Sequence, residues 1–384
     1  MRLSSCAMLP LVALISTACS ASTAPASEAQ PGGAAVAVPD GLPFTVTEQG
    51  RFETPFALAF LPDGRILVTE KTGKLKLRAI DGSVAEVSGV PAVAYGGQGG
   101  LLDVAIAPDF ATSHRIYLSY SEPRPTGSSL ALARAVLKEG AAPSLEGLEV
   151  IFRAGSDGAG GQFGANIAFS PDGKLLYLSS GERQRFTPAQ DPDQALGKIL
   201  RLTLDGKPAP GNPDAAAGGV RAETWSTGHR NPYGLAFAKD GRLWEIEMGP
   251  KGGDEVNLIL PGRNYGWPKV SNGDNYDGSP IPDHAPGDGF EAPKLFWNPS
   301  ISPGGLMIYS GGMFPAWQGS AFIAALSGQA LIRVTLDGDR AGKADQWDLG
   351  MRIRDVAQAP DGAIWLLQDG GKGVQGKLMR LVPR

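Results

Sequence analysis

One stretch of this 384-residue sequence, residues 228–268, gathers side chains suited to binding an anion and a metal ion. It reads GHRNPYGLAFAKDGRLWEIEMGPKGGDEVNLILPGRNYGWP. Arg230 offers a planar fork of donors for a carboxylate, and Asn231 offers both a donor and an acceptor. Glycines follow beside Asp254 and Glu255, and carbonyl and carboxylate oxygens are the ligands that Ca²⁺ prefers. The spacing is not that of an EF-hand, so an acidic turn capped by its own backbone is the alternative.

Two further loops carry related chemistry. Gln98 is the one side chain able to hydrogen-bond in the glycine-rich turn GGQGG, where the backbone can approach a ligand closely. A purely structural turn is the alternative there. Arg352 and Arg354 alternate along a predicted strand and therefore share one face. Two adjacent arginines repel unless an anion or a carboxylate lies between them, and Asp355 or another acid is the simpler partner.

The elements that must position these loops are short strands. The chain holds 53 Gly and 31 Pro, and only 19% of its residues are charged, a composition that favours strands and turns over long helices. A phrase of apolar residues around Asp-Gly, or a variant of it, recurs along the chain, and each copy predicts a hairpin. The marker aspartates are Asp63, Asp109, Asp172, Asp240 and Asp361.

The spacing of these aspartates gives the number of repeats. The gaps are 46, 63, 68 and 121 residues. The last gap is about twice the others, so it hides a further unit, whose remnant is predicted at residues 319–338. Six such units predict an all-β fold, a six-bladed β-propeller, whose ligand site lies on loops at one end of the central channel. A β-sandwich or β-helix with coincidental turns is the alternative.

The N-terminus predicts an exported protein. Residues 1–18 combine a basic start, an apolar core at 7–15 and a small-residue cleavage region, as in a signal peptide. Cleavage before Cys19 would leave a lipidated cysteine, as in bacterial lipoproteins. Plain cleavage near Ala18 or Ala21, which gives a soluble secreted protein, is the alternative. The expected location is therefore periplasmic, or the outer membrane through a lipid anchor.

The rest of the chain divides into a tether and one domain. Residues 19–41 are rich in Ala, Ser, Pro and Gly and predict a flexible tether, and residues 42–384 form the predicted propeller. The other cysteine lies in the signal segment, so no intrachain disulfide is expected. A net charge of −4 gives no basic footprint, which excludes nucleic acid and anionic membrane surfaces as partners. A monomer and a homodimer are both compatible with the sequence.

Taken together, the loops resemble those of the soluble PQQ-dependent glucose and aldose sugar dehydrogenases, which are six-bladed propellers. The resemblance runs from about Pro55 to the C-terminus and is carried by GQGGLLDVAIAPDF, GHRNPYGLAF, EMGPKGGDEVN and NYGWP. It implies that pyrroloquinoline quinone (PQQ), which bears three carboxylates, is bound by Gln98, Arg230, Asn231, Arg352 and Arg354. It also implies Ca²⁺ bound through backbone oxygens of Gly249 and Pro250, with a calcium in the aldose-type members that uses Glu255 and Tyr265.

The same resemblance implies oxidation of an aldose sugar at its anomeric carbon to a lactone, with electrons passed to an external acceptor. The general base of the family is a histidine in the phrase GGHFGGRL. This chain reads GGQFGANI, so Gln162 occupies the position of the base and Asn166 that of the arginine. Glutamine cannot accept the proton, so proton abstraction is expected to be impaired. His284, Glu182 and Asp157 are the candidate substitutes.

Two other functions stay open on the sequence. The first is a propeller that binds PQQ, calcium or sugar with little or no catalysis, which Gln162 favours. The second is a calcium-dependent lactone hydrolase, another enzyme on a six-bladed propeller, which would need carboxylate and amide ligands converging on a metal in the channel.

Overall fold

The computed structural model describes residue 1 and residues 34–155, 158–371 and 373–384. The predicted signal segment beyond Met1, Cys19 and Asp157 lie outside the described residues. The contacts divide the chain into two compact units, residues 1–30 and 31–384, and all elements below belong to the second. In the described part of the chain, no helix is both long and apolar enough to cross a bilayer.

The described residues form six antiparallel sheets of four or five strands, of the kind that the repeats predict, and one small two-stranded sheet. Each of the six larger sheets begins with a strand at the centre and adds strands outward in chain order, except that the last sheet takes its outer strands from the N-terminus. From the centre outward, the sheets are β3 (Pro55–Phe60), β4 (Ile66–Glu70), β5 (Lys74–Arg78), β6 (Val84–Val87); β7 (Leu101–Ile106), β8 (Arg115–Arg124), β9 (Gly127–Lys138), β10 (Ser144–Arg153); β11 (Gly164–Phe169), β12 (Leu175–Ser180), β13 (Lys198–Thr203), β14 (Thr224–Thr227); β15 (Pro232–Phe237), β16 (Leu243–Glu247), β18 (Asp254–Ile259), β20 (Leu295–Trp297); β21 (Pro303–Ile308), β22 (Ala321–Ala325), β23 (Ala330–Asp337), β24 (Arg340–Asp348); and β25 (Ile353–Gln358), β26 (Ile364–Gln368), β27 (Gln375–Pro383), β2 (Phe44–Glu53), β1 (Ala34–Ala35).

The remaining elements are short and lie in the connections. They are the helices α1 (Phe110–Ser113) and α2 (Gly219–Glu223), the 3₁₀ turns η1 (Thr187–Gln190), η2 (Ala215–Ala217) and η3 (Pro315–Trp317), and the strand pair β17 (Lys251–Gly252) and β19 (Gly273–Asp274).

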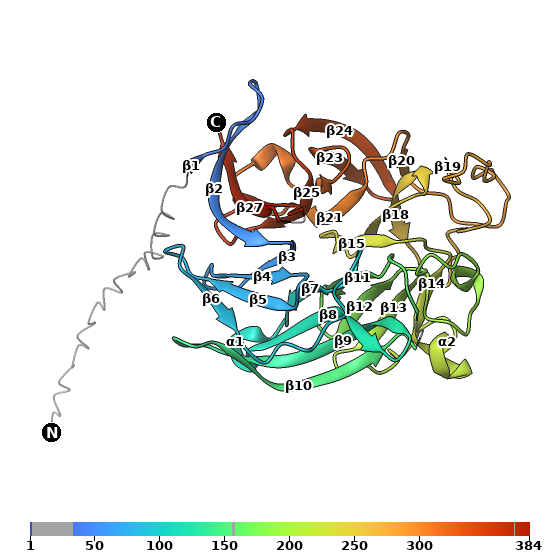
Figure 1. Cartoon of the computed structure of the whole chain (residues 1–384), viewed down its shortest axis with the longest axis horizontal. Coiled ribbons are helices and arrows are strands. Elements are labelled where there is room, and N and C mark those ends of the chain that lie inside the picture. The colour runs from blue at the N-terminus through green and yellow to red at the C-terminus, as the bar shows by residue number, and fades with distance from the viewer. Residues whose placement is uncertain (2–33, 156–157, 372) are drawn as a thin grey trace. The chain divides into compact units, whose positions relative to one another are not determined.

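The first strands of the six sheets stand side by side around the centre, and the ring closes (Figure 1). β3 contacts β7, and the contacts continue through β11, β15, β21 and β25 back to β3. The prediction of a six-bladed propeller is therefore confirmed. The hidden unit is the fifth blade, and residues 319–338 contain its second and third strands rather than its first hairpin. Its first strand, β21, is joined to β22 through η3 in place of an Asp-Gly turn.

Blades are joined to one another by hydrogen bonds as well as by apolar packing. In three blades, a hydroxyl on the second strand donates to a carbonyl at the first strand of the next blade. Each such buried bond contributes about 1 kcal/mol. The pairs are Thr69 with Leu102 at 2.6 Å, Ser119 with Ala165 at 2.6 Å, and Ser179 with Pro232 at 3.0 Å.

The N-terminal strand β2 completes the last blade. It pairs with β27 from Phe44 opposite Pro383 to Glu53 opposite Gln375. Phe44 and Phe52 are buried in this blade. Packing continues before Leu42, because β1 pairs with β2 and Val36 is buried. Residues 34–41 of the predicted tether thus lie against the propeller.

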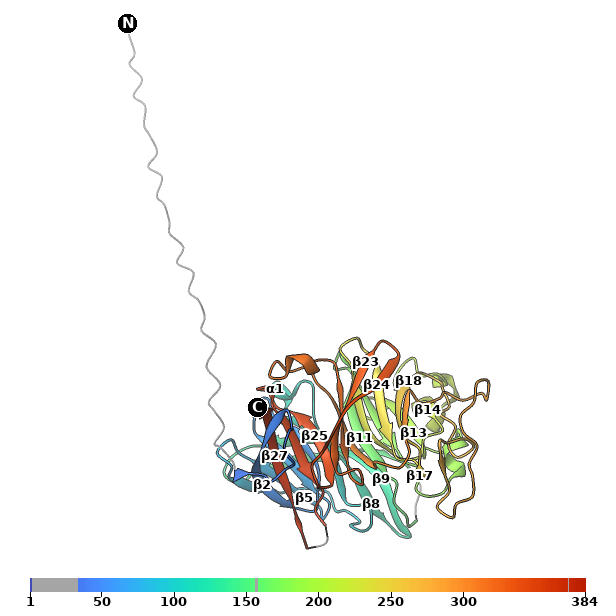
Figure 2. The same ribbon diagram turned by 90° about the horizontal axis from the view of Figure 1, so that it is seen from above.

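The topology fixes which loops meet. In every blade, the start of the first strand lies beside the end of the second, as Pro232 lies opposite Glu247 in β15 and β16. Because the blades repeat around the ring, these strand ends lie at the same end of the channel. Figure 2 shows the strands running from one end of the ring to the other.

Candidate active site

Four of the five loops singled out in the sequence stand before the first strand of a blade. Gln98 precedes β7, Gln162 precedes β11, Arg230 and Asn231 precede β15, and Arg352 precedes β25. The turn after β16, which carries Gly249 and Pro250, reaches the same end by the strand geometry. The propeller therefore brings the predicted site residues to one end of its ring.

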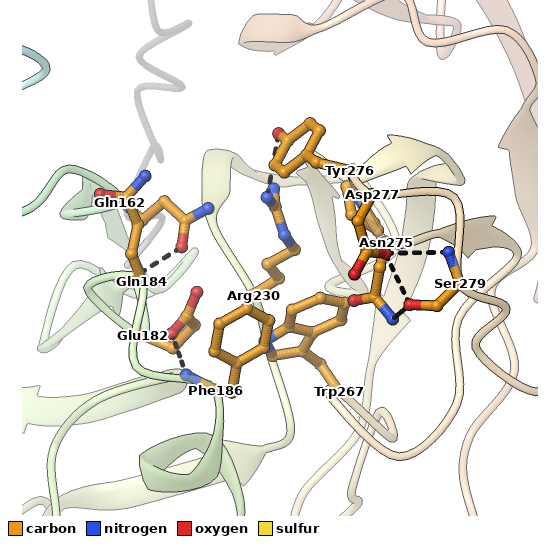
Figure 3. Close-up of a pocket in the computed structure, with 11 residues that line it drawn as sticks. Gln162, Glu182, Gln184, Phe186, Arg230, Trp267, Asn275, Tyr276, Asp277 and Ser279 are labelled. Carbon is orange, nitrogen blue, oxygen red and sulfur yellow. Dashed lines mark hydrogen bonds between the residues drawn. The ribbon is translucent and has the colours of Figure 1, made fainter.

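A cavity of about 560 Å³ opens at this end, between loops of the third and fourth blades. Figure 3 shows Arg230 extending between Gln162 and Gln184 on one side and Trp267 and Tyr276 on the other. The lining residues are Gln162, Glu182, Gln184, Phe186, Arg230, Pro250, Trp267, Asn275, Tyr276, Asp277 and Ser279. The cavity thus combines one cation, aromatic rings and carboxylates.

Arg230 is the cation of the cavity, and it is 5% exposed. Its Nη1 donates to the carbonyls of Met248 at 2.9 Å and Gly249 at 2.7 Å, and its Nη2 donates to the Tyr276 hydroxyl at 3.2 Å. The guanidinium lies 5.2 Å from the centre of the Trp267 ring and 5.8 Å from that of Tyr276. Among the described residues, its buried Nε–H has no partner. A buried donor without a partner is costly, so the site is suited to an anion.

Gln162 lies at the cavity in a strained conformation. Its φ of 56° falls in the left-handed region, which non-glycine residues adopt mainly where function or packing requires it. Its N–H donates to Gln98 Oε1 at 2.6 Å, and its side-chain oxygen accepts from the N–H of Gln184 at 3.1 Å. Tyr233 donates to the same Gln98 oxygen at 3.2 Å. The amide of Gln162 is thus fixed in place and carries no group that accepts a proton near pH 7.

Glu182 is the buried acid of the cavity, and it lies two residues after the end of β12. It is 1% exposed, and its Oε2 accepts the N–H groups of Arg185 and Phe186. Burial raises the pKa of Glu182, and the N–H groups of Phe186 and Arg185 together with Arg230 oppose that rise only in part. Figure 3 shows its other oxygen pointing away from Phe186 N. Glu182 is therefore placed to exchange a proton with a ligand.

Asn231 and Gln98 lie behind the lining residues and tie the loops together. Asn231 Oδ1 accepts the N–H of Gly164 at 3.2 Å. The N–H groups of Arg230 and Asn231 both donate to Glu247 Oε2, at 2.6 and 3.2 Å. These bonds fix the loop before β15 against the loop before β11.

Arg352 and Arg354 share one acid, which is Asp369 and not the adjacent Asp355. Arg352 Nε donates to Asp369 Oδ2 at 3.0 Å, and Arg354 Nη2 donates to Oδ1 at 3.0 Å. Burial opposes ionisation of Asp369, but Arg354 and Arg352 together lower its pKa. Asp355 instead accepts the N–H of Leu58 in the neighbouring blade at 2.9 Å.

A third cation lies near this pair. Burial, Arg354 and Arg352 lower the pKa of Lys71, while Asp369 raises it. Lys71 follows β4 and Asp369 follows β26, so both lie at the site end of the ring. Three cations facing one acid leave an excess of positive charge. The cluster can therefore take an anionic group, although it does not line the cavity around Arg230.

The predicted metal turn is built around Gly249. A Cβ at this position would lie 2.2 Å from the carbonyl oxygen of Gly252, so only glycine fits. Asp254 holds the turn, because its Oδ1 accepts the N–H of Gly249 at 2.9 Å and its Oδ2 accepts those of Ile301 and Ser302 at 2.7 Å. Asp254 is thus capped by backbone, as the alternative for this turn predicts, and its position argues against its expected use as a calcium ligand.

The other predicted metal residues meet at a second, small cavity. Gly249, Glu255 and Tyr265 line a space of about 10 Å³, while Pro250 lines the large cavity. That volume suits one water or one ion. The Tyr265 hydroxyl is engaged elsewhere, because it donates to Leu258 O at 2.6 Å and accepts from Leu260 N at 2.9 Å. A contribution from Tyr265 would therefore come from its backbone.

The histidines do not lie at the large cavity. His229 is fully buried, with Nε2 2.8 Å from Ser226 Oγ and Nδ1 3.2 Å from Glu247 Oε1. His284 lies with Nδ1 3.6 Å from Asp288, and burial lowers its pKa. Of the three candidate substitutes for the base, only Glu182 lines the cavity among the described residues.

The fold and this site define a six-bladed propeller with a cation-bearing ligand cavity on the loops at one end of its ring. Residues 52–380 match the model of the glucose/sorbosone dehydrogenase family. The chain belongs to this family.

Relatives named as aldose sugar dehydrogenases agree with that assignment. The chain is 40% identical over 346 residues to the aldose sugar dehydrogenase YliI of Escherichia coli (strain K12), across 88% of this chain and 92% of the relative. A solved structure of the soluble aldose sugar dehydrogenase from Escherichia coli in its apo-form has a TM-score of 0.83 and 38% identity, and covers 89% of this chain and 100% of that one. The PQQ-bound aldose sugar dehydrogenase from Streptomyces coelicolor has a TM-score of 0.73 and 30% identity, over 91% of this chain and 100% of that one.

Sequence reasoning missed several residues of the site. Lys71 and Asp369 directly follow the second strand of their blades, and that shared position was the signal that could have found them. Phe186 and Tyr276 come from irregular loops. No periodic pattern marks such residues.

Proposed function

We propose that this protein oxidises aldose sugars at the anomeric carbon to lactones, with PQQ and Ca²⁺ as cofactors and an external electron acceptor. The observation that carries the proposal is the position of Arg230, a buried cation that lines a cavity of about 560 Å³ beside the Gly249–Pro250 turn. Membership of the glucose/sorbosone dehydrogenase family supports it.

The residues of the site fit a flat quinone bearing carboxylates. Arg230 supplies a fork of donors whose Nε–H has no protein partner in the described chain, and Trp267 and Tyr276 supply aromatic faces. Arg352, Arg354 and Lys71 would hold further negative charge, since Asp369 neutralises only one of them. When bound, PQQ supplies an electrophilic quinone that accepts hydride from the sugar, and Ca²⁺ polarises it.

The calcium would be held by the Gly249 and Pro250 carbonyls, with Glu255 at the adjoining small cavity. Gly249 O already accepts Arg230 Nη1 at 2.7 Å. A carbonyl oxygen has two lone pairs, so one carbonyl can serve both cations. Asp254 keeps the turn in the required shape through Gly249 N.

Glu182 would accept the hydroxyl proton of the sugar in place of the histidine that Gln162 replaces. Its carboxylate borders the same cavity as Arg230, and one of its oxygens is not used by the N–H groups of Arg185 and Phe186. A raised pKa makes a carboxylate a better base near neutral pH. The side chain of Gln162 would then bind the sugar or position Gln184 rather than take the proton.

The test is a dye-reduction assay on the purified full-length chain with PQQ, Ca²⁺ and a panel of aldoses. Turnover that requires PQQ and yields the lactone supports the proposal. A shift in the PQQ spectrum without turnover would favour the second candidate, a propeller that binds PQQ without efficient catalysis, which Gln162 supports. No PQQ binding at all would overturn both.

We also propose that the protein is exported, to the periplasm or to the outer membrane as a lipoprotein anchored at Cys19. The support is the sequence of residues 1–19 alone. Radiolabelled palmitate should enter the wild type and not a Cys19→Ala variant. Export of an unlabelled wild type would instead identify the soluble periplasmic form.

A further inference from the structure

The six blades can be compared position by position, and one blade departs from the others in its core. The residues compared are those of the second strand that lie opposite one equivalent position of the first strand in each blade. Five of these second-strand residues are apolar and buried, and the sixth is a glutamate that is 0% exposed. The pairs are Leu58–Val68, Val104–Leu118, Ile167–Leu178, Leu235–Glu245, Leu306–Ile323 and Val356–Leu366.

Glu245 is part of a buried polar group between β16 and β18. It pairs with Asn257 across the two strands, and Glu247 pairs with Glu255. Asn257 Nδ2 lies 3.0 Å from Glu245 Oε2, 3.3 Å from Glu247 Oε1 and 3.2 Å from Glu255 Oε2. An amide nitrogen has only two hydrogens, so Asn257 cannot satisfy three carboxylates at once.

Two atoms of this group are left without partners. Glu245 Oε1 and Asn257 Oδ1 are buried and have no hydrogen-bond partner among the described residues. The three acids that meet at Asn257 are all buried, with exposures of 0% for Glu245, 4% for Glu247 and 7% for Glu255. Buried carboxylates without positive charge are strongly unfavourable. Among the described residues, the only side chain that forms an ion pair with these acids is His229, 3.2 Å from Glu247, so the group has no Lys or Arg partner.

We propose that the fourth blade binds a buried divalent cation, best matched by Ca²⁺, through the carboxylates of Glu245 and Glu247 and the side-chain oxygen of Asn257. These donors are hard oxygens, which calcium prefers over nitrogen and sulfur. A half-turn of the Asn257 amide brings Oδ1 to the place of Nδ2, since the two ends have the same shape. Glu255 borders this site and contributes to its negative charge.

The spacing of the candidate ligands fits one ion. One ligand atom each from Glu245, Glu247 and His229 lie within 4.8 Å of one another, and ligands on opposite sides of one Ca²⁺ lie about 5 Å apart at most. His229 is held by Ser226 and contacts Glu247 Oε1, so it orients Glu247 as a neighbouring group. The site adjoins the small cavity at Gly249, because Glu247 and Glu255 line that cavity. Glu245 and Asn257 do not line it, and they are the groups that the new site adds.

The experiment measures metal content in the full-length chain without PQQ. The protein is stripped with a chelator, reloaded with Ca²⁺, freed of excess ion and analysed by mass spectrometry of the metal. Glu245→Leu restores the residue type of the sister blades and should bind one Ca²⁺ fewer per chain than the wild type. Terbium luminescence excited through the adjacent Trp244 should show the same loss.

The matched control is Glu70→Gln. Glu70 occupies in the first blade the register position of Glu247, since it pairs with Pro55 as Glu247 pairs with Pro232. Glu70 already accepts the N–H of Glu53 at 2.8 Å and faces Lys76 at 4.0 Å. Its replacement should leave the calcium content unchanged.

Equal calcium content in the wild type and Glu245→Leu would overturn the proposal and show that the acids are neutralised by protons. Should Glu245→Leu fail to fold, the isosteric Glu245→Gln gives the comparison, with reduced calcium affinity expected. A wild type whose melting temperature does not rise with Ca²⁺ more than that of Glu245→Gln would also overturn it. A larger rise with Zn²⁺ than with Ca²⁺ would overturn the assignment to a hard cation. None of these readouts depends on sugar oxidation.

Discussion

Arg230 Nη1 donates a 2.7 Å hydrogen bond to the carbonyl oxygen of Gly249, so the cation of the cavity and the turn expected to hold calcium share one atom. The same guanidinium donates to Met248 O and to the Tyr276 hydroxyl. Its planar fork is therefore used on three sides, which a lysine cannot reproduce. Anion binding and metal binding should consequently depend on each other at this position.

Arg230→Lys should weaken PQQ binding by roughly 10- to 100-fold, the effect of losing about one to two charge-assisted hydrogen bonds. The measurement is a fluorescence titration of PQQ at fixed Ca²⁺. Arg242→Lys, an exposed arginine beside Asp240 in the same blade, is the control and should bind as the wild type does. PQQ affinity within twofold of the wild type in Arg230→Lys would contradict a role in anion binding.

Glu182→Gln should lower the rate of PQQ reduction by sugar by about 10² to 10⁴, the usual effect of a general base, with little change in PQQ affinity. Because burial raises the pKa of Glu182 and the base must be ionised, the wild-type rate should fall as the pH drops through that pKa. The variant should lose this acid limb. The measurement is stopped-flow reduction across pH.

Glu223→Gln is the matched control, since burial also raises the pKa of Glu223, which lies in α2. It should keep the rate and the acid limb. A Glu182→Gln variant with an unchanged profile would show that another group takes the proton.

Gln162→His should increase the rate of sugar oxidation, because imidazole accepts a proton near neutral pH. Histidine also tolerates the positive φ of 56° at this position better than most residues. The change costs the bond from Gln184 N to the Gln162 side chain. Gln184→His tests specificity, since Gln184 lines the same cavity with a φ of 59°. An equal gain in both variants would mean that any imidazole in the cavity suffices.

The sequence was enough to predict the blades and the loops before the first strands, because each carries a repeated or long local pattern. It did not show that Asp369 separates Arg352 from Arg354, since that contact joins strands of one blade through register alone. Nor did it reveal Glu245, because LWEIE reads as the ordinary alternation of apolar and polar residues along a strand. Only the alignment of six observed ladders shows that this residue occupies a core position.

Two buried acids on strands at the channel should lower the free energy of unfolding as the pH rises. Burial raises the pKa of Asp103 to about 7 and that of Asp355 to about 8, where the charge of Asp103 adds to the effect. The folded state therefore holds protons that the unfolded state releases above about pH 4. The free energy of unfolding should fall between pH 5 and 8, by on the order of 1 kcal/mol per pH unit for each acid.

Urea unfolding at several pH values measures this slope. Asp103→Asn should reduce it, even though the variant loses an acceptor for Ile167 N or Val104 N. The exposed Asp339→Asn should keep the wild-type slope. An identical slope in all three proteins would exclude Asp103 as the source.

Deletion of β2 should unfold the domain, whereas deletion of residues 1–33 should leave its melting temperature unchanged. β2 buries Phe44 and Phe52 and pairs along the whole of β27. Each buried phenylalanine contributes about 1.5–3 kcal/mol, so the loss approaches the whole stability of a typical domain, about 5–15 kcal/mol. Circular dichroism during heating measures the melting temperature of both truncated proteins. A cooperative transition without β2 would show that three strands suffice for the last blade.

The pairing of β2 with β27 has a consequence for protein engineering. Phe44 lies opposite Pro383, so the start of β2 and the end of β27 are neighbours in one sheet. A short peptide could join them, and the chain could be opened instead at an exposed turn such as the one around Gly241 between β15 and β16, where an added Cβ would meet no atom within 4 Å. Circular permutants of this kind would move the cut to another blade while the cavity around Arg230 keeps its residues. The order in which the blades are synthesised could thus be changed while the residues of the site stay the same.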